Sequence, residues 1–267
     1  MDNTYPSVVA RFLAAYDAQL RMDAETAGAE RITHHGPLLL VTYAGGDGFI
    51  TYRDLSALPA SEIRQLVSEA LNYFQNDETI VRVEWKTRGH DRAEGLFDAL
   101  LDNGFVREEQ ESIVIGDAKA LAVEVPLPDG VTLRQITNES DVRAMCAMQD
   151  EVFGDPGNAE LADALLHRLT LADGMELWVA EAHGDIIAAG RLDPVPNSDF
   201  AGIWGGATRI QWRGKGIYRA LTAARARSAL RMGKSLIHSD STDFSRPILE
   251  RAGLVAVSST TPFVWTR

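Results

Sequence analysis

Cysteine is almost absent from this sequence of 267 residues, in which Cys146 is the only one. A single cysteine excludes an intrachain disulfide and a zinc site built from several cysteines. Long apolar runs are also missing, since none approaches the roughly 20 residues that a membrane-spanning helix needs. The opening residues, 1–5, lack a basic segment followed by an apolar run, so no secretory signal is predicted. We therefore expect a cytoplasmic protein with no membrane partner.

Basic residues are fewer than acidic ones, with 26 Lys and Arg against 38 Asp and Glu and a net charge of −12. This charge argues against a nucleic-acid partner, because phosphate repulsion would have to be overcome locally. Residues 1–125 carry 21 acids and 11 bases, whereas residues 126–267 carry 17 and 15. The first half therefore holds most of the negative charge, which would attract a cationic small molecule. An apolar content of 45% is typical of a globular protein with a full core.

Acidic residues are missing altogether between Asp199 and Asp240. The same stretch holds eight bases: Arg209, Arg213, Lys215, Arg219, Arg225, Arg227, Arg231 and Lys234. Such a window is typical either of an anion site or of a basic, solvated helix face, and charge alone leaves both open.

The clearest domain boundary lies near residues 117–130, where Val125–Gly130 contains two prolines and a glycine that break regular structure. We expect one domain at residues 1–122 and a second at residues 126–267. Apolar spacing in the second domain predicts the mixed α/β order β-α-α-β-β-β-α-β-α-β(-β). The expected strands are 131–134, 176–182, 186–192, 200–208, 235–239 and a closing pair at 255–258 and 262–265. The expected helices begin near 138, 158, 217 and 245.

The first half is predicted to contain the same kinds of element. We expect helices at 7–22, 61–74 and 92–102 and strands at 38–43, 48–52, 79–85 and 112–115. Residues 94–105 and 245–254 each read as a helix that follows a strand and ends in Gly plus an apolar residue. This likeness favours a diverged internal duplication.

The most informative motif is the turn Arg213-Gly214-Lys215-Gly216, which follows an apolar strand and precedes a helix. A diphosphate needs converging backbone N–H groups and the positive end of a helix dipole. Glycines allow the close approach and the positive φ angles that such a turn requires. The turn matches neither G-x-x-x-x-G-K-[ST] nor G-x-G-x-x-G, the two nucleotide fingerprints.

The run from Thr208 to Leu221 resembles the acetyl-CoA signature of the GNAT superfamily of N-acetyltransferases, [Q/R]-x-x-G-x-[G/A]. Gln211, Gly214 and Gly216 fit its three defining positions. The resemblance implies an α/β acyl-CoA N-acyltransferase fold in residues 126–267. It also implies a degenerate copy of that fold in the first half, where residues 54–61 contain no Gly-rich turn.

The resemblance implies that acetyl-CoA, as acyl donor, gives its acetyl group to the amine of a small molecule. It also implies that the strand before the turn splays from its neighbour to receive the thioester. The cofactor-binding residues would be Ala207, Thr208, Arg213, Gly214, Lys215, Gly216, Ile217, Tyr218 and Ser245. Two positions depart from the family pattern. Tyr218 stands where a small residue is common, and Leu249 stands where many members have a tyrosine that protonates the thiolate.

Three residues are candidates for the catalytic steps: Asp199 as a base acting through water, His238 as a proton carrier, and Ser241 as a partner of the thiolate. A lone histidine in an apolar strand is, however, more often a structural residue. The serines equally suit caps of the following helix. His34-His35 and His90-Asp91 lack further ligands, so no metal is expected. A catalytically inactive CoA-binding module and a nucleotide-phosphate binder are the alternative functions. A monomer and a homodimer are both open.

Overall fold

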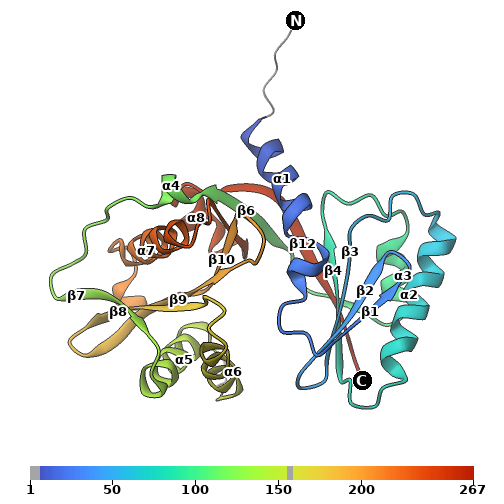
Figure 1. Cartoon of the computed structure of the whole chain (residues 1–267), viewed down its shortest axis with the longest axis horizontal. Coiled ribbons are helices and arrows are strands. Elements are labelled where there is room, and N and C mark those ends of the chain that lie inside the picture. The colour runs from blue at the N-terminus through green and yellow to red at the C-terminus, as the bar shows by residue number, and fades with distance from the viewer. Residues whose placement is uncertain (1–6, 155–158) are drawn as a thin grey trace, which may run out of the picture. The chain divides into compact units, whose positions relative to one another are not determined.

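The chain forms two compact units, seen in the computed structural model, which describes residues 7–154 and 159–267 (Figure 1). Unit 1 contains the chain up to Val114 together with Asp240–Arg246 and Ala256–Arg267. Unit 2 contains Ile115–Ser239 and Pro247–Val255. The units differ from the continuous ranges 1–122 and 126–267, because the last strand belongs almost wholly to unit 1. That these ranges are two copies of one fold remains a prediction.

Unit 1 is a sheet with helices around it. The neighbouring strands are β1 (Arg31–His35), β2 (Leu38–Tyr43), β3 (Asp47–Tyr52), β4 (Arg82–Arg88) and β12 (Val255–Thr266), with the short β5 (Val106–Arg107) beside β12. β3 and β4 run parallel, and the other pairs are antiparallel. The helices are α1 (Val8–Gln19), η1 (Met22–Glu25), α2 (Ala60–Gln75) and α3 (Leu96–Asp102).

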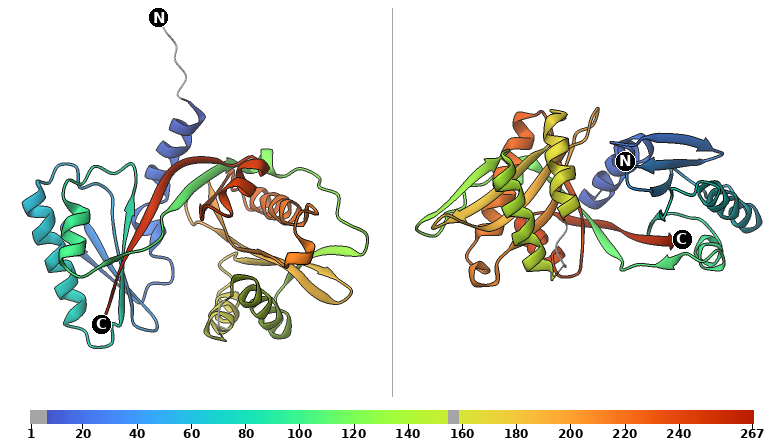
Figure 2. Two further views of the ribbon diagram at one scale, coloured as in Figure 1. Left: turned by 180° about the vertical axis from the view of Figure 1, so that it is seen from behind. Right: turned by 90° about the horizontal axis from the view of Figure 1, so that it is seen from below.

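The core of unit 1 lies between the sheet and α2. Four α2 residues recur at helical spacing and are buried: Ile63, Leu66, Val67 and Ala70. They pack against Trp85 and other strand residues in one cluster. Figure 2 shows α2 and α3 lying on the same side of these strands.

Unit 2 is built on an antiparallel meander of four strands followed by a parallel fifth strand. In spatial order these are β11 (Leu236–Ser241), β10 (Phe200–Thr208), β9 (Asp185–Pro194), β8 (Glu176–Ala182) and β7 (Val131–Ile136). β6 (Glu111–Asp117) continues from unit 1 into unit 2. The helices are α4 (Ala118–Leu121), α5 (Glu139–Phe153), α6 (Ala159–Thr170), α7 (Ile217–Arg231) and α8 (Arg246–Ala252), with the turn η2 (Ile210–Trp212) before α7.

The two faces of the unit 2 sheet are covered by different helices (Figure 1). On one face, α5 and α6 pack in a cluster with Ala189 and Ala207. On the other, Ile217 and Leu221 of α7 pack against Ala188. α5 begins at the cap Asn138, whose side chain accepts the N–H of Asp141. The strand before the Gly-rich turn is therefore enclosed from both sides.

Most of the predicted elements are confirmed, but the closing strand pair is wrong. Residues 255–258 and 262–265 belong to one strand, β12, that runs through Ser259 and Pro262. The intervening serines and threonines suit an extended chain, and no glycine stands there to turn it. The strand β1 and the short helix α4 were not predicted. The expected start of the second helix at Asn158 lies outside the described residues.

Two further observations concern membranes and Cys146. Within residues 7–154 and 159–267, no helix is both long and apolar enough to cross a membrane. Cys146 is buried on α5, at 3% exposure, and burial raises the pKa of its thiol. Thiols in such surroundings form little of the reactive thiolate.

Candidate functional site

The site begins where β10 separates from β11. Their parallel pairing ends at Gly202 and His238, although β10 continues to Thr208 and β11 to Ser241. The Ser239 hydroxyl donates to the carbonyl of Ile203 across 2.9 Å, which joins the two strands at the fork. Beyond this point, no residue of β11 in the described part of the chain pairs with the edge of β10. Its backbone groups there are positioned to bind an extended ligand.

A bulge interrupts β10 just past the fork. The register with β9 shifts between Trp204 and Ala207, and Gly205 has a φ of 59°. Gln149 on α5 donates through Nε2 to the Gly205 carbonyl at 2.6 Å. Bulges bend a strand and redirect its groups. The bulge therefore turns the backbone of Gly206 out of the regular ladder.

The Gly-rich turn joins β10 to α7 through two residues in the left-handed region. Gly214 has a φ of 75° and Gly216 a φ of 80°. A Cβ on Gly214 would meet nothing within 4 Å, so the space over it is open. No side chain among the described residues caps α7. The N–H groups of its first turn, which have no partner inside the helix, lie at the positive end of the helix dipole.

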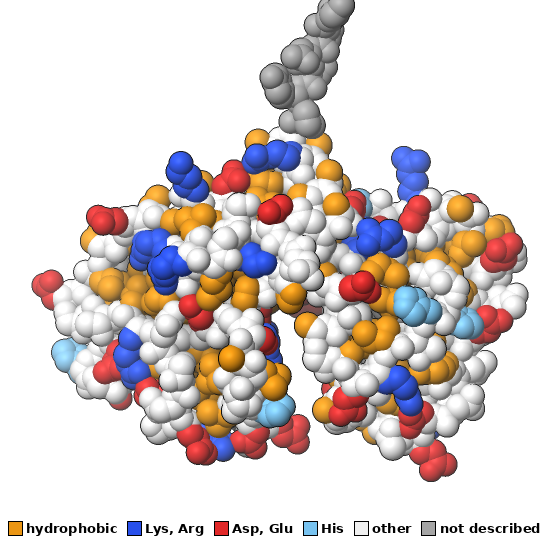
Figure 3. Space-filling view, in the orientation of Figure 1, with side chains coloured by type: hydrophobic (Ala, Val, Ile, Leu, Met, Phe, Trp, Pro, Cys, Tyr) orange, Lys and Arg blue, Asp and Glu red, His pale blue; other side chains and the backbone are white. Residues whose placement is uncertain are grey.

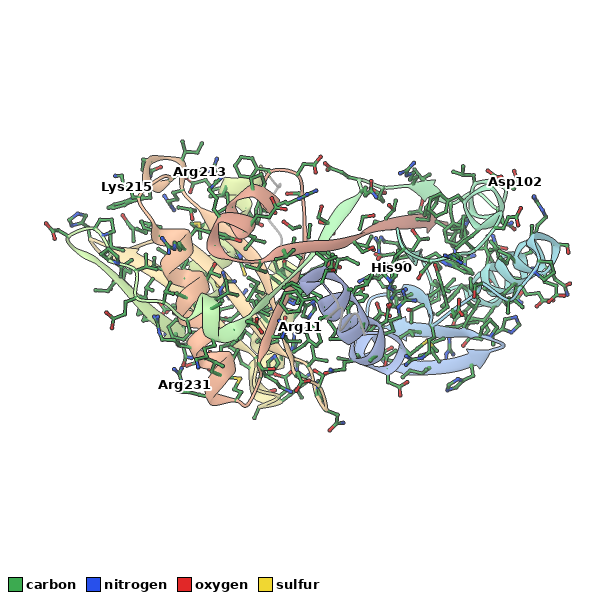
Figure 4. All side chains as sticks on the ribbon, turned by 90° about the horizontal axis from the view of Figure 1, so that it is seen from above. Arg11, His90, Asp102, Arg213, Lys215 and Arg231 are labelled. Carbon is green, nitrogen blue, oxygen red and sulfur yellow. The ribbon has the colours of Figure 1, made fainter. Side chains whose placement is uncertain are left out.

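The eight basic residues of the acid-free window do not form one patch. Arg213, Lys215 and Arg219 lie at or next to the turn, where Lys215 is exposed. Arg231 lies at the opposite end of α7, about 21 Å away at the helical rise (Figure 4). Arg225 is buried at 1% exposure. Only the first group is placed to meet an anion at the turn.

The charges at the turn are held in place by nearby groups. Arg213 Nε donates to the carbonyl of Thr208 at 3.0 Å. Lys215 Nζ lies 4.6 Å from the centre of the Trp212 ring. Both contacts restrict long side chains in advance, which lowers the entropy lost when an anion binds. Elsewhere, acidic and basic side chains are interspersed on the visible surface of each unit (Figure 3).

Tyr218, which replaces the common small residue, lies against the strand. A Cβ on Gly206 would lie 2.6 Å from Tyr218 Cε2 and 2.8 Å from its hydroxyl. Only glycine leaves room for the ring at this position. Arg225 lies further along the same helix, against Gly190, and donates to the carbonyl of Arg191 at 3.2 Å. Burial lowers the pKa of Arg225, while the nearby Tyr218 hydroxyl acts in the opposite direction.

Asp199 lies far along the strand from the bulge. It stands before the first residue of β10, where its carbonyl accepts the N–H groups of Ser235 and Leu236, both at 2.9 Å. Ala207 lies eight residues along the strand, about 26 Å away at the rise of an extended chain. The structure therefore gives no support to Asp199 as the base, because strand length separates it from the bulge.

His238 does lie at the fork. The centre of its ring lies 5.3 Å from that of Trp204 and 5.7 Å from that of Phe200, and both pairs are edge-to-face. Trp204 is in register with Arg191, which shares a sheet face with Ala189, since alternate strand residues point the same way. Ala189 packs with α5 and α6. His238 is therefore on the α5 and α6 face, opposite to α7.

Ser241 and Ser245 fall in unit 1, whereas His238 and the Gly-rich turn fall in unit 2. The two serine hydroxyls are 2.8 Å apart, and Ser245 also meets Thr242 Oγ1 at 3.2 Å. They form a hydroxyl cluster immediately before α8. Leu249 on α8 is buried at 2% exposure and has no group that can donate a proton.

Two residues of this site escape prediction from the sequence. Gln149 and Arg225 belong to helices whose spacing marks only their apolar positions. An arginine inside an acid-free window is expected to be exposed to solvent, so nothing in the sequence indicates that Arg225 is buried. The glycines that contact Arg225 and Gln149 are Gly190 and Gly205, and both are far in sequence from these helices. For the described residues, no group of three or more His, Cys, Asp or Glu side chains could hold a metal ion.

Comparison with known proteins places this geometry in a known fold. No protein-family model matches the sequence, and no curated protein matches it significantly. Among solved structures, a GCN5-related N-acetyltransferase from Kribbella flavida superposes with a TM-score of 0.69 at 14% identity, covering 97% of this chain and 96% of that one.

Two further structures superpose with a TM-score of 0.61. One is a GCN5-related N-acetyltransferase from Sphaerobacter thermophilus, at 15% identity over 86% of this chain and 76% of that one. The other is a tandem GNAT protein from the clavulanic acid biosynthesis pathway, at 13% identity over 86% and 78%. The predicted resemblance is thus confirmed at the level of the fold, which extends over nearly the whole chain.

Proposed function

We propose that this chain, which has the fold of the GNAT N-acetyltransferases, transfers an acetyl group from acetyl-CoA to the amine of a small molecule. The observation that carries this proposal is the continuity of three features along one segment. The fork after Gly202, the bulge at Gly205 and the turn at Gly214–Gly216 follow one another directly into the uncapped start of α7.

Each part of this segment suits one part of acetyl-CoA. The first N–H groups of α7, from Ile217 and Tyr218, suit the diphosphate, with Arg213 and Lys215 supplying positive charge. The backbone of Ala207 and Thr208 at the unpaired edge of β10 suits the pantetheine amides. Ser245 lies in the other unit, and only the resemblance supports it as a cofactor-binding residue.

Acetyl transfer requires a deprotonated amine and stabilisation of the developing oxyanion. The redirected backbone N–H groups near Gly206 are proposed as the oxyanion donors. His238 is proposed to take the proton of the amine, because it lies at the fork on the face that α7 does not cover. Leu249 supplies no proton to the thiolate. A thiol with a pKa of about 8.5 leaves as an anion without great cost, so a dedicated acid is not essential.

A specific observation favours a second function, a CoA-binding module without catalysis. Leu249 is buried and apolar where the resemblance implies a proton-donating tyrosine. The turn would bind CoA in either case, and only turnover separates the two functions.

The test combines binding with turnover in the full chain. Acetyl-CoA and CoA are titrated by calorimetry, and thiol release is then followed with a panel of amino sugars, polyamines and other primary amines. Binding with amine-dependent thiol release supports the enzyme. Binding without release for every amine supports the inactive module. Affinity for ATP or NAD in place of CoA would overturn both.

A further inference from the structure

The acyl end of the proposed coenzyme site falls at the fork of β10 and β11, because the groups of the coenzyme follow β10 in order. The diphosphate is proposed at the start of α7, the pantetheine amides along the end of β10, and the oxyanion donors near Gly206. Acyl carbons beyond the carbonyl therefore continue toward Trp204 and the point where the two strands join, at Gly202. All of these residues belong to unit 2.

Within the plane of the sheet, the fork is closed at its narrow end. β10 and β11 pair up to Gly202 and His238, and the Ser239 hydroxyl then donates to the carbonyl of Ile203 at 2.9 Å. An acyl chain that reached this point would have to leave the plane toward one of the two sheet faces. The side chains on those faces therefore decide how long a chain fits.

Trp204 covers the face on which α5 and α6 lie. Gly202 and Trp204 are two residues apart on β10 and share this face, since alternate strand residues point the same way. A Cβ on Gly202 would lie 2.4 Å from Trp204 Nε1 and 3.0 Å from Trp204 Cζ2, so the indole folds back along the strand over the glycine. The His238 ring lies edge-to-face with Trp204. The two rings together span both strands at the end of the fork.

Tyr218 covers the other face. Its ring extends from the first turn of α7 onto Gly206, where a Cβ would lie 2.6 Å from Tyr218 Cε2. Gly202 and Gly206 thus each lack a side chain where a ring from elsewhere in unit 2 lies. The acyl end of the fork is therefore enclosed by the Trp204 indole on one face and by the Tyr218 phenol on the other.

The Trp204 indole is also accessible to a ligand. Phe200, four residues earlier on the same face, is fully buried, whereas Trp204 is only half-buried and the adjacent Gly205 is exposed. Part of the indole surface therefore faces the open side of the fork.

From this enclosure we infer that Trp204 sets the acyl length of the donor, so that the site accepts acetyl and excludes butanoyl and longer chains. The inference rests on the proposed function. Gly206 and Trp204 are two residues apart, about 7 Å at the rise of an extended strand, and a van der Waals contact of about 4 Å leaves about 3 Å. That length holds one or two carbons beyond the carbonyl, and a third would overlap the indole.

The inference is tested by calorimetric titration of the full chain with acetyl-CoA, propionyl-CoA, butanoyl-CoA and hexanoyl-CoA, with no amine present. The wild type is expected to bind butanoyl-CoA at least tenfold more weakly than acetyl-CoA, because the extra methylenes overlap the indole. In Trp204→Ala, the ratio of these two affinities should shift at least tenfold in favour of butanoyl-CoA. Each ratio is measured within one variant, so a change that affects both donors equally, such as a shift of His238, cancels.

Trp178→Ala is the matched control. Trp178 is another half-buried tryptophan of unit 2, but it lies on β8, packs in the cluster with α7, and donates through Nε1 to Glu176 at 2.7 Å. Its loss should lower the melting temperature and leave the affinity ratio unchanged. Trp204→Leu is a second variant in case Trp204→Ala does not fold. Leucine keeps an apolar side chain but is too short to cover Gly202, so the ratio should shift in the same direction.

Failure of the inference and failure of the proposed function give different results. If neither CoA nor any acyl-CoA binds, the proposed coenzyme turn is wrong, and the inference fails with it. If CoA binds but the wild type binds acetyl-CoA and butanoyl-CoA equally, only the inference is overturned. The same holds if the ratio is unchanged in both Trp204 variants, or if it shifts as much in Trp178→Ala.

Discussion

The side-chain amide of Gln149 on α5 donates to the carbonyl oxygen of Gly205, at 2.6 Å, in the bulge of β10. The two residues require one another. A Cβ on Gly205 would lie 2.8 Å from the same amide nitrogen, and the φ of 59° also favours glycine. The amide in turn satisfies a carbonyl that the bulge removes from the strand ladder. Gln149 is 7% exposed, so water does not easily replace it.

Gln149→Leu should therefore loosen the bulge. We expect a loss of about 1–3 kcal/mol in the free energy of unfolding, because the Gly205 carbonyl is left without its donor. If the N–H groups near Gly206 stabilise the oxyanion, kcat should fall at least tenfold while the KM for acetyl-CoA changes little. Urea denaturation and steady-state kinetics measure the two effects.

Gln65→Leu provides the matched control, since the Gln65 amide donates to Glu69 on the exposed face of α2. That change should alter neither stability nor kcat. Equal kcat values for Gln149→Leu and the wild type would show that the bulge does not position a catalytic group.

A second prediction concerns Gly206 and Tyr218. Gly206→Ala should destabilise the fold by about 1–3 kcal/mol, because the new methyl group would overlap the Tyr218 ring. Tyr218→Ala removes that ring, so in its background the Gly206→Ala change should cost much less. A double-mutant cycle of unfolding free energies measures the coupling. Additive effects of the two changes would contradict the packing of Tyr218 on the strand.

The strand, turn and helix of the site were predictable from the sequence because their signals are local. The apolar run of β10, the glycines of the turn and the helical spacing of α7 lie within 32 consecutive residues, 200–231. Each requires only steric rules for short segments. The element order followed from the same local signals, whereas the fold was implied by the resemblance of residues 208–221 to the GNAT signature.

Long-range relationships could not be predicted in the same way. β12 pairs with β4, with Thr260 opposite Arg88, although about 170 residues separate them. Nothing in a local pattern reports such a pairing. Asp199 was a reasonable base by residue type, yet it precedes β10, and the length of that strand separates it from the bulge. Gln149 and Arg225 were missed for the same reason, because their importance depends on glycines that approach them only in the folded chain.

A third prediction tests the turn itself. Gly216→Asp should weaken CoA affinity at least a hundredfold, because it places a negative charge where the diphosphate is proposed to bind. The fold should persist, since aspartate tolerates positive φ better than most residues and is favourable at a helix start. Calorimetric titration with CoA, together with circular dichroism, measures both outcomes.

Gly233→Asp is the control for backbone strain. Gly233 follows the other end of α7 and has a φ of 78°, and a Cβ added to it would meet nothing within 4 Å, as at Gly214. The variant should bind CoA as the wild type does, even if its stability is slightly lower. A similar loss of affinity in both variants would mean that strain, and not the charge at the turn, causes the effect.

The last prediction concerns His238. His238→Phe preserves the aromatic edges toward Trp204 and Phe200 but removes both ring nitrogens. If His238 takes the proton of the amine, kcat should fall by about 10²- to 10⁴-fold while CoA affinity stays the same. A histidine that accepts a proton makes the rate rise with pH as the ring loses its own proton. The variant should lack this rise in its pH–rate profile.

His34→Phe, on the exposed β1, is the control and should leave the rate and its pH profile unchanged. A structural role for His238 predicts a different pattern. In that case His238→Phe would retain kcat and the full pH profile, because the ring contacts are maintained, whereas His238→Ala would lower the melting temperature by opening a cavity beside Trp204. Measuring kcat, its pH dependence and the melting temperature for both variants therefore distinguishes the proton carrier from the core residue.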